Sequence, residues 1–287
     1  MTTTSSLTAR TAAAARAAHL IVDEPPLIFA DPLAERLLGG EAEELLSYHR
    51  LHGSHVVLAG ARAQVTCRSR YAEDHLASAV ADGIRQYVIL GAGLDSFAYR
   101  SPVADQVAIF EVDMLATLDD KRARLSAAQL EVPDNVVFVA VDFESGSLSA
   151  DLANNGLDLS EPAFVSWLGV TMYLSRDALG ATFKELSRLG SGTQVVADYM
   201  LPAELRDEAG ETYVELVAPS SAERGEPWLS FLSPVQMSEL LASHGFATLR
   251  QVAQRDVGDT QMWHRSDALR PANLSVIAHA ATCGVRG

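Results

Sequence analysis

The residues best suited to chemistry lie in the segment "VILGAGLDSFAYR", which runs from Val88 to Arg100. Its first four residues are apolar and typical of the end of a buried strand. Gly91 and Gly93, on either side of Ala92, then predict a tight turn, and this turn also carries Asp95. Two glycines let a ligand lie directly against the main chain, because neither has a side chain in the way. The turn therefore predicts a site for a nucleotide-like molecule.

Carboxylates end the next two predicted strands. Glu111 and Asp113 lie in "FEVD", about 20 residues after the first glycine, where an acid can accept two hydrogen bonds from a ribose diol. Asp142 and Phe143 follow in "VDFE", where we expect a contact with the exocyclic amine and one face of an adenine. Together these residues predict a ligand that contains adenosine.

Two classes of adenosine-containing cofactor are alternatives for this turn. The dinucleotide fingerprint needs a third glycine, so that a helix N-terminus can meet the pyrophosphate. Here Ser96 follows Asp95, which places a negative charge where the phosphates would lie. An acid in the turn favours a ligand with a cationic end and no phosphate, which describes S-adenosylmethionine. An NAD-dependent oxidoreductase remains an alternative.

Six segments, in this order, resemble methyltransferases of the leucine carboxyl methyltransferase type, which use S-adenosylmethionine. They are "RSRYAEDHL", "VILGAGLDSFAYR", "FEVD", "VDFE", "SWLGVTMYL" and "RGEPWLSF". The opening "RTAAAARAAHLIVDEPPLIFADPLAERLLG" is similar to the N-terminal region of the same family, so the resemblance spans nearly the whole chain. The group includes carboxyl methyltransferases of polyketide pathways and many uncharacterised bacterial enzymes.

The resemblance implies a role for individual residues. Arg68 matches the arginine that pairs with the carboxylate of the methionine moiety, a contact for which a guanidinium fork is suited. Many relatives carry a glutamate where this chain has Leu168, so the contact of that glutamate is in doubt here. The complete set of residues that we expect to contact the cofactor is Arg68, Gly91, Ala92, Gly93, Asp95, Glu111, Asp113, Asp142, Phe143 and Leu168.

Candidates for positioning the methyl acceptor flank the tip of the fourth predicted strand, and one more lies in a predicted loop nearer the C-terminus. They are Trp167, Tyr173 and His264, and the loop from Ser220 to Pro234 could fold over the same place. No histidine or lysine is placed as an evident general base, which favours an already ionised carboxylate over a hydroxyl. No histidine or cysteine spacing indicates a metal site.

These residues predict an O-methyltransferase that forms a methyl ester of a small molecule. Orientation of the acceptor is the main task of such an enzyme, because the cofactor carries the reactive carbon. A protein of the same fold that binds S-adenosylmethionine without transferring its methyl group is a second alternative, since its cofactor pocket would look the same. The acceptor itself and the choice between carboxylate and hydroxyl stay open.

The elements that must position these residues form an α/β pattern. Apolar runs predict strands at residues 87–90, 107–113, 136–143, 163–170 and 193–200, with helices between them, and two last strands at 247–254 and 273–282. We expect a Rossmann-like class I methyltransferase sheet, mostly parallel with an antiparallel C-terminal strand. Residues 1–85 read as a helical N-terminal cap and residues 86–287 as the cofactor-binding core, in one integrated domain.

Composition narrows the class of partner. The formal net charge of -15 disfavours nucleic acid and anionic membranes as partners. Two cysteines are too few for a disulfide framework, and no stretch approaches the length of a membrane span. We therefore expect a cytoplasmic enzyme that acts on a small carboxylic acid or hydroxyl acceptor, and the sequence leaves its oligomeric state open.

Overall fold

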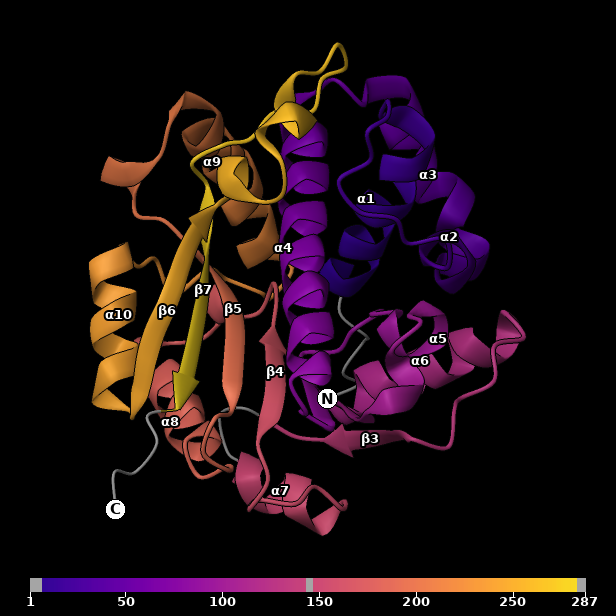
Figure 1. Cartoon of the computed structure of the whole chain (residues 1–287). Helices are drawn as coiled ribbons and strands as arrows, with labels where there is room; N and C mark the ends of the chain where they lie inside the picture. The colour runs from indigo at the N-terminus through magenta and orange to yellow at the C-terminus, as the bar shows by residue number, and fades with distance from the viewer. Residues whose placement is uncertain (1–6, 143–146, 283–287) are drawn as a thin grey trace.

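A seven-stranded sheet forms the centre of the computed structural model, which describes residues 7–142 and 147–282 (Figure 1). The strand order is β3-β2-β1-β4-β5-β7-β6; β1 to β5 run parallel, and β7 pairs antiparallel with both β5 and β6. The predicted fold class is therefore confirmed. The strands are β1 Gln86–Leu90, β2 Ala108–Asp113, β3 Val136–Ala140, β4 Ala163–Trp167, β5 Gln194–Met200, β6 Phe246–Ala253 and β7 Ser275–Thr282.

The central strands have apolar residues throughout because both of their faces are covered. Every residue of β1 is buried, and alternate residues point to opposite sides of the sheet. Val88 and Leu90 pack in one hydrophobic cluster, and Tyr87 and Ile89 pack in another. On the first face lie α7 (Leu148–Asn154), α8 (Arg176–Leu186) and α10 (Pro234–Ser243), and on the second α4 (Val56–Ala81) and α5 (Phe97–Arg100).

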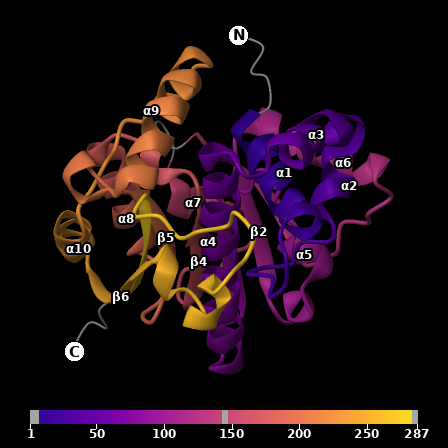
Figure 2. The same cartoon turned by 90° about the horizontal axis from the view of Figure 1, so that it is seen from above.

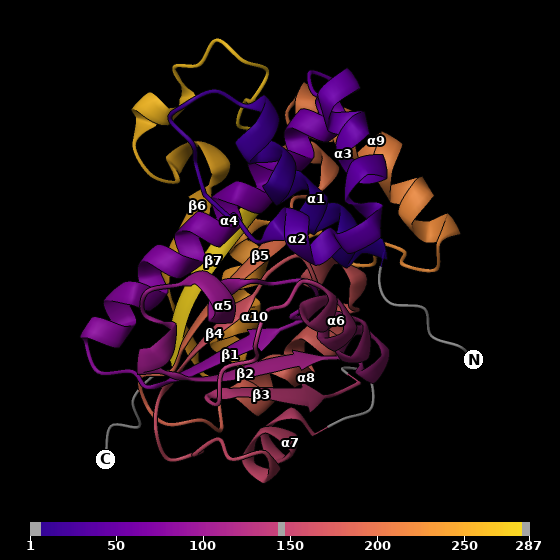
Figure 3. The same ribbon diagram turned by 90° about the vertical axis from the view of Figure 1, so that its right-hand side faces the viewer.

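The described residues before Gln86 form helices and no strand. The long helix α4 lies between α9 (Glu208–Glu223) on one side and the N-terminal helices on the other (Figure 2). Figure 3 shows the same helices gathered beyond one side of the sheet. The N-terminal helices are α1 Leu7–Val22, α2 Ala34–Leu38 and α3 Ala42–His52. Because α4 also packs on β4, a division of the chain at residue 85 stays a prediction.

Element boundaries differ from the sequence prediction where glycine turns the chain. The fourth strand was expected to reach Val170 but ends at Trp167, since Gly169 has a φ of 74°. The helix between β2 and β3 is α6, Leu115–Ala127. Across residues 7–142 and 147–282, none of the helices combines the length and the apolar character that crossing a membrane requires.

Candidate active site

The glycine turn leaves β1 at the carboxyl end of the parallel sheet, where ligands of such sheets bind. The amides of Gly91 and Ala92 both donate to the carbonyl of Val112, at 2.8 and 3.0 Å. Gly91 and Gly93 have φ values of 69° and 43°, a region that favours glycine. A Cβ on Gly91 would lie 2.3 Å from Cγ2 of Val170. The turn therefore needs glycine, because Val170 occupies the place that a side chain of residue 91 would take.

Asp113, at the end of β2, stabilises this turn through hydrogen bonds. Its Oδ2 accepts from the amide of Gly93 at 2.8 Å and its Oδ1 accepts from the amide of Met114 at 2.7 Å. Burial raises the pKa of the Asp113 carboxyl. Each carboxylate oxygen has more than one lone pair, so both can still accept from a ligand hydroxyl. Asp95 also has a local role, because its Oδ1 accepts from the amide of Phe97 at the start of α5.

A cavity of about 470 Å³ opens beside the turn, and we name it the turn cavity. It lies between the strand ends of the sheet, the first half of α1 and the loop that follows α9. The structure brings together here most of the residues that the sequence predicts as cofactor contacts. Those that line the turn cavity are Arg68, Gly91, Ala92, Gly93, Asp95, Asp113 and Leu168, with the acceptor candidate Tyr173.

Arg68 reaches the turn cavity from α4 and is held there by a buried acid. Its Nη1 lies 3.1 Å from Oδ2 of Asp198 on β5, and Asp198 has no exposed surface. Oδ1 of Asp198 accepts from the amide of Gly169 at 2.5 Å. A Cβ on Gly169 would lie 2.3 Å from the guanidinium, so the glycine lets Arg68 lie against the chain. Sequence reasoning missed Asp198, whose only signal is an acid inside the apolar strand "VVADYM".

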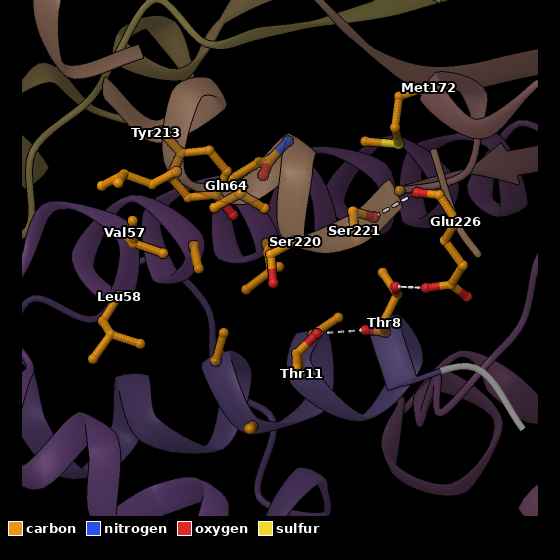
Figure 4. A pocket seen from close by; sticks show the side chains of 18 of the residues that line it. Thr8, Thr11, Val57, Leu58, Gln64, Met172, Tyr213, Ser220, Ser221 and Glu226 are labelled. Atoms are coloured by element: carbon orange, nitrogen blue, oxygen red, sulfur yellow. Dashed lines mark hydrogen bonds between the residues drawn. The ribbon is translucent and has the colours of Figure 1, made fainter. Parts of the chain in front are cut away.

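A second cavity, of about 370 Å³, adjoins the first, and we name it the helix cavity. It is enclosed by α1, α3, α4 and α9, and Figure 4 shows Thr8 and Thr11 on one side of it with Gln64 and Tyr213 on the other. Its lining is mainly apolar, with hydroxyl groups from threonine, serine and tyrosine. The residues that line both cavities, and so form the wall between them, are Thr8, Ala12, Arg68, Gly169, Tyr173 and Glu226.

The loop after α9 closes both cavities. The hydroxyl of Thr8 donates to the carboxylate of Glu226, which joins the first turn of α1 to this loop (Figure 4). Trp228 also lines the helix cavity and stacks on Tyr213, with 6.5 Å between the ring centroids. The segment from Ser220 to Pro234, predicted as a loop, thus contributes to the site region, but its first four residues belong to α9 and Pro234 begins α10. Tyr173 lies in the shared wall, and burial raises the pKa of its hydroxyl.

Arg16 joins α1 both to Asp31, in a buried ion pair, and to the glycine turn, and no local sequence pattern predicts these contacts. Nε of Arg16 lies 2.8 Å from Oδ2 of Asp31, and its Nη2 donates to the carbonyl of Leu94. Burial alone would raise the pKa of Asp31, but Arg16 and Arg100 outweigh it and the pKa is lowered. The N-terminal helices are therefore part of the wall of the turn cavity.

Three predicted contacts need correction. Glu111 is fully buried with Nζ of Lys121 at 2.6 Å, so it faces the interior instead of a ligand; burial raises the pKa of its carboxyl. Trp167 is fully buried too, against Phe183, and lines neither cavity. His264 is exposed, directly follows the short 3-10 turn Thr260–Trp263 and lines neither cavity. Glu111 and Asp113 are two positions apart and so point to the same face of β2, but Asp113 ends the strand, whereas Glu111 lies within it and pairs there with Lys121 of α6.

The predicted adenine side of the site is described only in part. Asp142 is exposed just after β3 and lines neither cavity. Phe143 lies outside the described residues. Contacts of Asp142 and Phe143 with an adenine therefore stay predictions.

Comparison with known proteins identifies the family. Residues 9–187 match the family described as leucine carboxyl methyltransferase. Relatives named "Putative S-adenosyl-L-methionine-dependent methyltransferase" include YktD of Bacillus subtilis, which is 30% identical over 96% of this chain and 97% of its own. Another, from Mycolicibacterium paratuberculosis, is 32% identical over 84% of this chain and 86% of its own.

Solved structures agree on the fold. A protein from Thermobifida fusca superposes with a TM-score of 0.61 at 17% identity, covering 97% of this chain and 95% of its own. A DUF574 family protein from Streptomyces avermitilis has a TM-score of 0.58 at 19% identity, with coverages of 94% and 97%. The match to the family covers more than half of the chain and includes the glycine turn and Arg68. The chain therefore belongs to the leucine carboxyl methyltransferase family and is a methyltransferase that uses S-adenosyl-L-methionine.

Proposed function

We propose that this enzyme transfers the methyl group to a carboxylate oxygen of a small molecule and so forms a methyl ester. The observation that carries the proposal is the wall shared by the two cavities, where Arg68, Gly169 and Tyr173 face both. Cofactor in the turn cavity and acceptor in the helix cavity would meet at this wall. The family description, leucine carboxyl methyltransferase, supports the same chemistry.

The residues of the turn cavity fit S-adenosyl-L-methionine. Gly91 and Gly93 line the turn cavity without side chains, which favours close approach of a flat adenosine, and Asp113 offers acceptors for ribose hydroxyls. Arg68 offers a guanidinium to the methionine carboxylate. When bound, the cofactor supplies a methyl group on a cationic sulfur, which is transferred by in-line displacement. The task of this chain is to hold the acceptor oxygen in line, and such orientation contributes roughly 7–11 kcal/mol in well-aligned systems.

The helix cavity supports a carboxylate as acceptor, because the histidine that lines it is not free to act as a base. Nδ1 of His49 lies 3.2 Å from Nη1 of Arg62 and is therefore already occupied as an acceptor. Burial raises the pKa of Tyr213 to about 12. No lysine lines the helix cavity among the described residues. A carboxylate is ionised near neutral pH and needs no base, whereas a hydroxyl does.

Glu226 favours a second candidate, methylation of a hydroxyl. It is the one carboxylate in the shared wall among the described residues, and it lies at the place where a general base would act. To take a proton from an acceptor hydroxyl, Glu226 would have to exchange its hydrogen bond from Thr8 for one from the acceptor. For a carboxylate acceptor, Glu226 only adds a like charge.

A methyl-transfer assay with S-adenosyl-L-methionine tritiated in its methyl group separates the two candidates. It compares small apolar carboxylic acids with the corresponding alcohols as acceptors. We expect labelled product from the acids alone. Because this product is a methyl ester, mild base should release its label as methanol. Glu226→Gln should keep or increase this activity. Transfer to the alcohols, lost by about a hundredfold or more in Glu226→Gln, would replace the carboxylate proposal by the hydroxyl one.

A further inference from the structure

His49 lines the helix cavity and has one defined hydrogen-bond donor. It lies on α3 and is 5% exposed. Nη1 of Arg62 lies 3.2 Å from its Nδ1. A guanidinium can only donate, so Nδ1 is the acceptor of this bond and the proton of the neutral ring must be on Nε2. No described residue is a partner of Nε2.

This arrangement is fixed by a buried network. Arg62 is 1% exposed and makes two bonds to the carboxylate of Asp23, at 2.8 and 2.9 Å, and a third to the carbonyl of Gly53. Nδ1 of His19 lies 2.8 Å from the same carboxylate of Asp23. Burial, and then the charge of Arg62, lowers the pKa of His49 to about 4. The ring is therefore neutral near pH 7 and keeps one tautomer.

The position of His49 along the cavity follows from α4. Val57, Ala61, Gln64 and Arg68 line the cavity at the spacing of one helix face. Figure 4 shows Val57 and Leu58 at one end and Thr8 of the shared wall at the other. Arg62, which holds the imidazole, precedes Arg68 by six positions, or about 9 Å along a helix. His49 is therefore placed toward the end of the helix cavity that is remote from the shared wall.

We propose that Nε2 of His49 donates a hydrogen bond to an uncharged oxygen of the acceptor, and so selects elongated apolar carboxylic acids with a keto, ester or ether group roughly 9 Å from the carboxylate. The inference rests on the proposed function for the placement of the carboxylate. The charge of Arg62 is already matched by Asp23, so this end of the cavity offers a neutral donor and no surplus charge. A cationic group would meet a donor it cannot use, and an anionic group would gain no ion pair.

The experiment compares straight-chain keto acids, in which the carbonyl is moved stepwise along the chain, with the parent fatty acids. Binding to the protein with its cofactor is measured by calorimetry, and methyl transfer is measured separately. For one window of carbonyl positions we expect the keto acid to bind about tenfold more tightly than its parent, as one well-placed hydrogen bond allows. His49→Asn, whose side-chain oxygen can still accept from Arg62, should abolish this preference. His49→Gln, whose amide can reach the position of Nε2, should retain part of it.

His52→Asn is the matched control, because His52 is exposed on the same helix and lines neither cavity. It should leave the preference unchanged. Equal binding of keto and parent acids by the wild type, no binding of any keto acid, or an unchanged preference in His49→Asn would overturn the inference. Keto acids that bind with the predicted preference but are not methylated would support the inference and contradict the proposed function. Acids that are methylated without any carbonyl preference would contradict the inference and support the proposed function.

Discussion

Asp198 holds Arg68 against Gly169 in the wall between the two cavities. One carboxylate oxygen of Asp198 lies 3.1 Å from Nη1 of Arg68, and the other accepts from the amide of Gly169. A single buried acid on β5 thus fixes both the turn after β4 and the guanidinium that comes from α4. The arginine has five N–H donors and makes one ion pair among the described residues, so it can offer other donors to a ligand carboxylate.

Arg68→Lys should weaken binding of S-adenosyl-L-methionine by about tenfold or more, since an ammonium cannot reproduce the fork of a guanidinium. Calorimetric titration with the cofactor measures this. The control is Arg70→Lys, two residues along the same helix, where the side chain is 35% exposed and pairs with Asp74 at the surface. If both variants bind the cofactor as the wild type does, Arg68 does not contact it.

Gly91→Ala should lower both stability and cofactor affinity, because the added Cβ would lie 2.3 Å from Cγ2 of Val170 and the φ of 69° disfavours alanine. Gly83→Ala separates the two causes: its φ is 109°, but a Cβ there would meet nothing within 4 Å. We expect Gly83→Ala to cost about 1 kcal/mol in urea unfolding and to leave cofactor binding intact. Val170→Ala added to Gly91→Ala should restore part of the lost stability. Equal effects of the two glycine variants would exclude the steric contribution.

The sequence predicts the fold and the turn cavity well, because both depend on local patterns. Apolar runs show the parallel strands, and the glycine turn must follow the first of them. Asp113 is found by its place at a strand end. Such features need only the periodicity of the chain and the rule that strand ends of a parallel sheet gather at one edge.

What the sequence does not predict depends on contacts between distant segments. Asp198 and Arg68 are 130 positions apart, and no local pattern joins them. His49 and Arg62 meet across the turn between α3 and α4, two helices that both pack on α1. The error at Glu111 has the same origin: its partner Lys121 comes from α6, and only their contact shows that the carboxylate points into the interior.

Glu111→Gln tests this correction. Removing the charge of Glu111 leaves the ammonium of Lys121 buried without its partner, so we expect a loss of about 3–5 kcal/mol in the free energy of unfolding. The fraction that stays folded should bind S-adenosyl-L-methionine with little change in affinity, because neither residue lines the turn cavity. Asp113→Asn should show the opposite pattern, with weaker cofactor binding and a smaller loss of stability.

The control for Glu111→Gln is Glu43→Gln. Glu43 also pairs with a basic residue, Arg50, but its side chain is 83% exposed, so the change should be within about 1 kcal/mol. Denaturant unfolding of the four proteins, each with and without cofactor, gives both quantities. A cofactor affinity that falls in Glu111→Gln as far as in Asp113→Asn would return Glu111 to the binding site.

His49 makes a specific contribution to the pH dependence of stability. Its pKa of about 4 in the folded chain lies below the ordinary value of 6.5, so between these values the unfolded chain binds more protons than the folded one. Stability from this group is present above pH 6.5 and is lost as the pH falls toward 4. By about pH 5 the loss should reach roughly 1–2 kcal/mol. His279, whose pKa is also lowered to about 4, adds a loss over the same range.

His49→Asn removes the first contribution and keeps the second, so between about pH 7 and pH 5 the variant should lose less stability than the wild type by roughly 1–2 kcal/mol. Urea unfolding at the two pH values measures this difference. His52→Asn, at an exposed position of the same helix, should lose as much as the wild type. Equal losses in all three proteins would mean that Nδ1 of His49 can take up a proton beside Arg62 at little cost. The fixed tautomer, and with it the donor that His49 offers to an acceptor, would then be wrong.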